Sequence, residues 1–141
     1  MKSHAFRLIK GQDLKQSIQN YCIENQISAA VVLSLVGCVD QAELRMAGGK
    51  VIKNWKQDFE IVSCTGTISS GKAHLHVVFS DVDAVCYGGH LQEGCIVNTT
   101  CEVVLGELEN YQFTREFDVT TGYKEIKITE YQIEKMQEFK K

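Results

Sequence analysis

The sequence contains no proline, which excludes proline-rich linkers and a minor-groove hook of the Arg-Gly-Arg-Pro type. It also lacks any apolar run near the ~18 residues that a membrane span requires, so we expect no membrane-spanning segment. Residues 1–7 lack the apolar region of a signal peptide. This start of the chain predicts a cytoplasmic protein.

Neither sign of charge is in large excess. Fifteen Lys and Arg residues stand against eighteen Asp and Glu residues, for a formal net charge of −3. A slightly acidic chain has no general attraction for the phosphate backbone of nucleic acids. The hydrophobic fraction of 44% and the charged fraction of 23% are typical of a soluble globular protein. A length of 141 residues suits one domain.

The six cysteines form no Cys-x-x-Cys pair. Their shortest spacing, Cys95 to Cys101, does not match the knuckle of a structural zinc site. Most of them lie inside apolar runs, for example at residues 36–39 and 85–87. We interpret them as reduced thiols that pack as small core side chains, Cys86 near His90 included, and not as disulfides or nucleophiles.

One helix is predicted after residue 13. Asp13 can cap it, Gln16 occupies the capping-box position, and Asn25 marks its end. The apolar side chains between them recur at helical spacing, at Leu14, Ile18, Tyr21 and Cys22.

Strands are predicted for most of the remaining chain. Residues 28–39 are apolar enough for a central strand, and Gly66 suggests a bulge in a strand over residues 59–68. The other expected strands cover residues 5–9, 42–46, 74–79, 85–91, 95–105, 112–117 and 124–129. Short strands separated by Gly and Asp turns predict an α+β fold: a single domain whose largely antiparallel sheet is packed by one main helix.

Three of the four histidines, His74, His76 and His90, fall within seventeen residues. His74 and His76 are two apart in a strand pattern, so their side chains share one face while Leu75 points into a core. A turn over residues 80–83 returns the chain antiparallel and brings His90 back alongside. The fourth, His4, is expected at the surface.

The length of that turn decides which face His90 occupies. A three-residue loop over residues 81–83 puts His90 opposite His74 on the same face, whereas a four-residue loop puts it on the other face. Gly88 and Gly89 allow a bulge that re-aims the ring. Three imidazoles with an open fourth position form a catalytic-type zinc site, and imidazole also suits other divalent metals. The alternative is a solvated strand face with His90 in a loop.

Arg45, Glu60 and Glu102 are charged residues inside apolar strand patterns. Such side chains either lie on the exposed face of an alternating strand or serve a site. In the second case Glu60 or Glu102 is the candidate catalytic acid or base beside the metal, and Arg45 is the candidate partner of a carboxylate. No Gly-x-Ser-x-Gly motif and no Walker-type loop is present.

An ordered series of motifs resembles one known family. The motifs are Ala5-Phe6-Arg7-Leu8, Gly11-Gln12-Asp13-Leu14, Gly37, Leu44-Arg45, Phe59-Glu60-Ile61, Gly66-Thr67-Ile68, His74-Leu75-His76, Gly88-Gly89-His90-Leu91, Gly94, Glu102-Val103 and residues 115–122. In this order, over residues 4–129, they resemble the PPC (plants-and-prokaryotes-conserved, or PCC) domain in its free-standing prokaryotic form. We therefore expect a PPC-like domain over residues 1–129. Residues 130–141 form a tail that is either helical, from the spacing of its apolar residues, or frayed.

The resemblance implies a fold similar to that of acetolactate decarboxylase, a homotrimer, and a metal site, usually taken as zinc, on His74, His76 and His90. Plant members of this family join the domain to an AT-hook and bind DNA. This chain has no such hook, and Gln57-Asp58 stand where the plant motif has Gly-Arg.

These observations predict a trimeric cytoplasmic protein that binds zinc, or another divalent metal, and a small polar ligand at the three histidines. The alternative is a DNA-binding or regulatory protein-interaction module without catalysis. Its candidate basic patch is Lys50, Lys53 and Lys56, and the net charge opposes it. A third reading keeps the trimer and gives the histidines a structural role.

Overall fold

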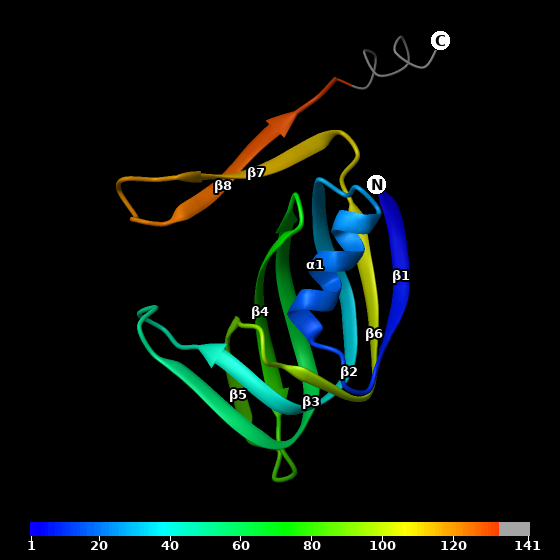
Figure 1. The fold of residues 1–141 in the computed structure, drawn as a ribbon, viewed down its shortest axis with the longest axis vertical. Coiled ribbons are helices and arrows are strands. Elements are labelled where there is room, and N and C mark those ends of the chain that lie inside the picture. The colour runs from blue at the N-terminus through cyan, green and yellow to red at the C-terminus, as the bar shows by residue number, and fades with distance from the viewer. Residues whose placement is uncertain (133–141) are drawn as a thin grey trace.

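The computed structural model describes residues 1–132 (Figure 1). The elements follow one another as β1 (Lys2–Ile9), α1 (Leu14–Glu24), β2 (Ala29–Arg45), β3 (Ile52–Ser69), β4 (Lys72–Ser80), β5 (Cys86–Leu91), β6 (Ile96–Glu107), β7 (Tyr111–Phe117) and β8 (Lys124–Glu130). The apolar spacing that predicted a helical tail falls on residues 133–141, outside the described residues.

Six strands form one antiparallel sheet in the order β1-β6-β2-β3-β4-β5, and β7 and β8 form a separate two-stranded hairpin. The end of β2 also pairs with β5, so that strands β2 to β5 close on themselves. In Figure 1 helix α1 lies across the sheet and the β7–β8 hairpin projects beyond it. The predicted α+β class, the largely antiparallel sheet and the central position of residues 29–39 are confirmed.

Helix α1 begins and ends where its caps predict. Asp13 Oδ1 accepts a hydrogen bond from the Gln16 backbone N–H at 2.9 Å, and Asn25 is the C-cap. Asp13 Oδ2 also accepts from the Gly94 N–H at 2.6 Å, which ties the helix start to the loop before β6. Leu14 and Ile18 are fully buried, and burial of each such side chain contributes about 1.5–3 kcal/mol.

Two expectations for the strands are wrong. Residues 28–39 and 42–46 belong to one strand, β2, because register shifts along it let the pairing continue past Asp40. The bulge expected at Gly66 lies instead between Ile61 and Ser63. Gly66, with φ +145°, pairs in register with Leu75, and a Cβ there would overlap the carbonyl oxygen of His74. It is glycine because two backbones approach closely.

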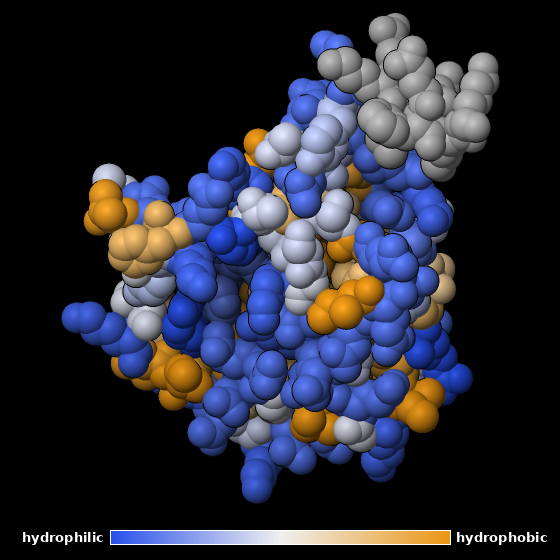
Figure 2. Space-filling model, turned by 45° about the horizontal axis from the view of Figure 1, so that its top comes forward, coloured by the Kyte–Doolittle hydropathy of each residue, from blue (hydrophilic) through white to orange (hydrophobic). Residues whose placement is uncertain are grey.

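The core lies between the sheet and α1. Strand β4 sends Leu75, Val77 and Phe79 into it, where Phe79 stacks on Phe59 with ring centroids 5.7 Å apart. Figure 2 shows a largely hydrophilic face with separate hydrophobic patches. Within residues 1–132, no helix has the length and apolar character to cross a membrane.

Candidate metal centre

The histidine site is built on the regular ladder of three strands. His74 and His76 lie on the face of β4 opposite to buried Leu75, as predicted. His76 pairs with Thr65 of β3 on one side and with His90 of β5 on the other. Residues directly opposite in a ladder have Cβ atoms about 4.5–5.5 Å apart. All three imidazoles therefore emerge from neighbouring positions on rigid strands.

The partner of His90 is not the one that either turn length predicted. The ladder closes at Ser80 and Cys86, so the turn covers residues 81–85 and His90 faces His76, not His74. A shift by two residues keeps a side chain on the same face, whereas a shift by one would have reversed it. Gly88 and Gly89 pair in regular register with Val78 and Val77, so no bulge re-aims the ring.

The three side chains converge closely enough to share one ion. Their ring centroids are 5.0–5.4 Å apart, and one potential ligand atom from each lies within 4.8 Å of the others. Zinc–nitrogen bonds of about 2.0–2.1 Å require the nitrogens to close to roughly 3.3 Å in a tetrahedral site. Two of the imidazoles are exposed and the third is half-buried, so the rings have room for the rotations that would bring the nitrogens to this distance. The donor set fits zinc.

The surroundings favour the neutral form of two of these imidazoles, His74 and His90. Burial, and next the Arg45 charge, lower the pKa of His90 to about 4. Burial, and next the Arg115 charge, also lower the pKa of His74 below its ordinary value. A neutral imidazole has a free nitrogen lone pair, which is the form that ligates a metal. Both residues are therefore in the ligating form at neutral pH.

Arg45 is the one of the three charged candidates that reaches the histidines. It ends β2, pairs with His90 across the ladder, and donates a hydrogen bond from Nη2 to His90 Nδ1 at 3.3 Å. Glu60 lies midway along β3, where it pairs with Cys38 and with Ser80 at the end of β4, and it lines a separate cavity of about 310 Å³.

Glu102 lies on β6, and two strands, β2 and β3, separate β6 from β4 in the sheet. It is exposed, and its ladder partners are Arg7 and Val36. The structure therefore does not bring Glu60 or Glu102 to the histidines.

The surface position expected for His4 is also wrong, since its side chain is 8% exposed and contacts Glu107 and Tyr21 at 2.7 and 3.2 Å.

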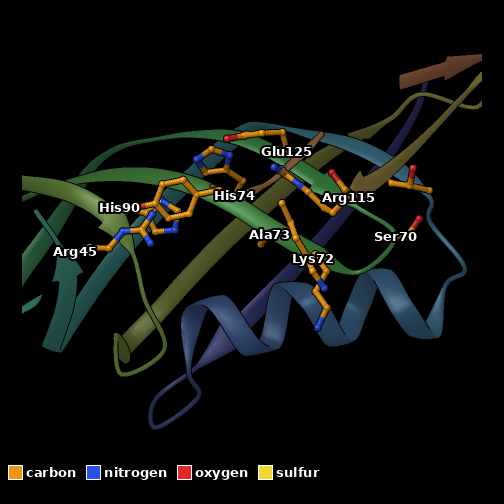
Figure 3. Close-up of a pocket in the computed structure, with 12 residues that line it drawn as sticks. Arg45, Ser70, Lys72, Ala73, His74, His90, Arg115 and Glu125 are labelled. Carbon is orange, nitrogen blue, oxygen red and sulfur yellow. Dashed lines mark hydrogen bonds between the residues drawn. The ribbon is translucent and has the colours of Figure 1, made fainter. Parts of the chain in front are cut away.

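A cavity of about 630 Å³ opens beside the histidines (Figure 3). Among its lining residues are His74 and His90 from the main sheet, and Arg115 and Glu125 from the β7–β8 hairpin. In Figure 3 Arg115 and Glu125 extend toward His74. Sequence reasoning missed these two residues because no local pattern shows that the hairpin folds back beside β4. The sequence did offer one signal for Arg115, which falls within residues 115–122, one of the motifs that resemble the PPC domain.

The sequence model of the Plants and Prokaryotes Conserved (PCC) domain matches residues 1–109. This chain belongs to that family. The PPC domain also occurs as part of larger proteins: the chain is 36% identical over 128 residues to the "Bifunctional protein GlmU" of Synechococcus sp. (strain JA-3-3Ab), which covers 91% of this chain and 21% of that protein. The chain thus spans about a fifth of the length of this curated relative.

Solved structures share the PPC fold. A protein from Salmonella cholerae-suis is 34% identical, with a TM-score of 0.88 and coverage of 92% of this chain and 94% of that one. A metal-containing protein from Archaeoglobus fulgidus is 30% identical, with a TM-score of 0.73 over 89% of this chain and 92% of that one. A protein from Bacteroides thetaiotaomicron, provisionally described as DNA-binding, is 22% identical (TM-score 0.79, coverage 89% and 91%) and shows the fold alone.

Proposed function

We propose that this PPC-domain protein holds a divalent metal ion, zinc, on His74, His76 and His90, and binds a small polar ligand in the adjoining cavity. We further propose that it does so as a cytoplasmic homotrimer. The observation that carries the metal proposal is the convergence of three imidazoles within 4.8 Å at the edge of a 630 Å³ cavity. The metal-containing relative from Archaeoglobus fulgidus supports it.

The donor set favours zinc among the common ions. Zinc accepts three imidazoles and keeps its fourth position for water or a ligand, whereas calcium and magnesium select oxygen ligands. Bound zinc supplies a Lewis acid and lowers the pKa of a bound water to about 7. The chain's own residues then shape the ligand site: Arg45 and Arg115 carry positive charge, and Glu125 supplies a carboxylate acceptor.

Exposed apolar side chains on the central strands support the subunit contacts that this proposal requires. Leu33 and Val36 of β2 and Val62 of β3 are 48%, 50% and 57% exposed. Apolar surface in the middle of a sheet is the kind that subunit contacts cover.

DNA binding fits the charge distribution less well. Lys53 and Lys56 are three residues apart on a regular stretch of β3, opposite Leu44 and Gln41, so their side chains point to opposite faces. The proposed basic patch is therefore divided, on a chain with a net charge of −3. A mobility-shift titration tests this alternative: tight binding to duplex DNA that weakens steeply with salt would favour it.

Metal analysis of the purified protein tests the zinc proposal. The protein, prepared without chelators, is expected to carry about one zinc ion per chain, and His76→Ala is expected to lose it. Thr65→Ala is the matched control, because Thr65 is the exposed ladder partner of His76. It is expected to keep the metal. A wild-type protein without metal, or a His76→Ala variant with full metal content, would refute the proposal.

A further inference from the structure

The geometry assigns a chemical class to the ligand: we propose that the cavity binds a small organic oxyanion, a carboxylate or a phosphate ester, between Arg45 and Arg115. The inference deepens the proposed function and rests on it, because the same cavity adjoins the metal centre. It depends on the charge of the cavity, on the hydrogen bonding of the two arginine side chains and on the wall formed by the β7–β8 hairpin.

The cavity is strongly basic although the chain is acidic. Its charged lining residues, apart from the histidines, are Arg45, Lys72, Arg115, Lys124 and Glu125. Four positive charges thus face one negative charge, in a molecule whose formal net charge is −3. A cleft lined by one sign of charge concentrates ligands of the opposite sign. A bound divalent metal ion would add further positive charge at the same place.

Arg115 carries an unsatisfied donor at this cavity. Its Nη2 atom is buried and, among residues 1–132, has no hydrogen-bond partner. A buried charged donor without an acceptor is costly, and a guanidinium fork matches the two oxygens of a carboxylate or phosphate. Arg115 extends toward His74 in Figure 3, and both residues line the cavity. An oxyanion there would satisfy Nη2.

Arg45 occupies the other side of the histidines and becomes available when the metal binds. A guanidinium only donates hydrogen bonds, so its contact of 3.3 Å requires an unprotonated Nδ1 on His90. If His90 held a metal through Nε2, its Nδ1 would carry the proton, and if it held the metal through Nδ1, that lone pair would be used by the metal. In either case the contact would be lost, and the Arg45 guanidinium would be free for an anionic ligand.

The β7–β8 hairpin gives the cavity its outer wall. Ser70 Oγ donates to the Phe113 carbonyl oxygen at 2.8 Å, and the Phe113 side chain is buried, which anchors the base of the hairpin. Near its tip the Tyr123 hydroxyl approaches Gly49 in the turn between β2 and β3, 3.2 Å from where a Cβ would lie. A volume of about 630 Å³ fits a small organic molecule.

Titration calorimetry on the zinc-loaded protein tests the proposal. The probes are succinate, inorganic phosphate and succinamide, which is the uncharged counterpart of succinate. Succinate or phosphate is expected to bind, and succinamide at least tenfold more weakly. Arg115→Gln and Arg45→Gln are each expected to weaken oxyanion binding by about tenfold or more, the effect of one lost charge-assisted hydrogen bond. The relative strength of succinate and phosphate identifies the anionic group.

Lys127→Gln is the matched control, since Lys127 lies on the same hairpin but pairs with Glu116 at 2.9 Å, both largely exposed. It removes an equal charge and is expected to change the affinity less than twofold. Equal oxyanion affinity in wild type and Arg115→Gln would overturn the proposal, as would equal binding of succinate and succinamide, or no binding of either oxyanion. Zinc content is measured on each variant. Arginine-dependent oxyanion binding by a wild-type protein that takes up no zinc on loading would uphold this inference and refute the metal proposal.

Discussion

His76 lies directly opposite His90 in the β4–β5 ladder, and both stand on the face that carries His74. The metal centre is therefore positioned by strand register and not by loops. Side chains on paired strands are held more precisely than side chains on loops. The ladder has to stay intact on both sides of β4 for the three imidazoles to converge.

Gly66→Ala is expected to damage both stability and the metal site. The new Cβ would overlap the His74 carbonyl oxygen and lie 2.9 Å from Leu75 Cα, at a φ of +145°. Overpacking and backbone strain together predict a loss of about 2–4 kcal/mol in the free energy of unfolding. Zinc affinity is expected to fall with it, because β4 must move away from β3.

Gly122→Ala is the control for backbone strain alone. Gly122 has a φ of +77° and no atom within 4 Å of the added Cβ, so we expect a loss of about 1 kcal/mol and unchanged zinc affinity. Urea unfolding and a zinc titration measure both quantities. Equal losses in the two variants would show that the close approach to His74 does not matter.

Arg45→Gln is expected to raise zinc affinity, by about tenfold. The substitution removes a positive charge that opposes the incoming cation, and a hydrogen bond to His90 Nδ1 that metal binding must break. Competition with a zinc indicator dye measures the change. Lys127→Gln, outside the cavity, is expected to leave zinc affinity unaltered. Weaker zinc binding by Arg45→Gln would mean that Arg45 instead orients His90 for the metal.

The sequence was sufficient for features that depend on local chemistry. The Asp13 cap, the buried face of α1 and the shared face of His74 and His76 follow from side-chain type and period, and the structure bears them out. The register of His90 does not follow in this way. Asp81 Oδ1 accepts from the N–H groups of Asp83 and Val85, both at 2.9 Å, and this network fixes a turn over residues 81–85. A run of Asp, Val and Ala specifies no such length.

The basic cavity lay beyond sequence reasoning for a different reason. Arg115 lies on β7 and Glu125 on β8 of the same hairpin. Arg115 pairs with Ile126, the residue after Glu125, and Glu125 pairs with Glu116. Their place beside His74 depends on how that hairpin docks on the rest of the chain. Docking is set by long-range contacts such as the Ser70–Phe113 hydrogen bond. Conversely, Glu60 and Glu102 looked functional only because charged residues on an exposed strand face interrupt apolar patterns.

Five of the six cysteines are expected to divide into one reactive thiol and four protected ones. Burial raises the pKa of Cys22 to about 11, and those of Cys64, Cys95 and Cys101 to about 12. Cys86 is exposed, so the sequence-based expectation of a packed thiol is wrong there. Iodoacetamide at pH 8, followed by mass spectrometry, is expected to modify Cys86 first. Rapid modification of the four raised-pKa thiols in the folded protein would contradict this.

The raised pKa values of these four thiols predict that the folded protein loses stability in alkali. Unfolded thiols ionise near their ordinary pKa of about 9, while these four stay protonated in the folded state up to about pH 11 or 12. The folded state therefore binds more protons in that window, and the free energy of unfolding falls as pH rises above about 9. Urea unfolding between pH 8 and pH 10 measures the slope. Cys64→Ala is expected to make the fall of the free energy of unfolding with pH shallower. An unchanged slope would show that other groups cause the pH dependence.

Val36→Glu is expected to convert the proposed trimer into monomers. Val36 is half exposed on the central strand β2, directly opposite Glu102 of β6. A carboxylate at position 36 would face that of Glu102 across the ladder, and like charges in this arrangement repel. It would also place a charge in the apolar surface that assembly would bury. Light scattering after size-exclusion chromatography is expected to show the mass falling from three chains to one.

Val82→Glu is the control, because Val82 is 87% exposed in the turn between β4 and β5, and this variant is expected to stay trimeric. A wild-type protein that runs as a monomer would refute the trimer, and a trimeric Val36→Glu variant would move the interface to another face.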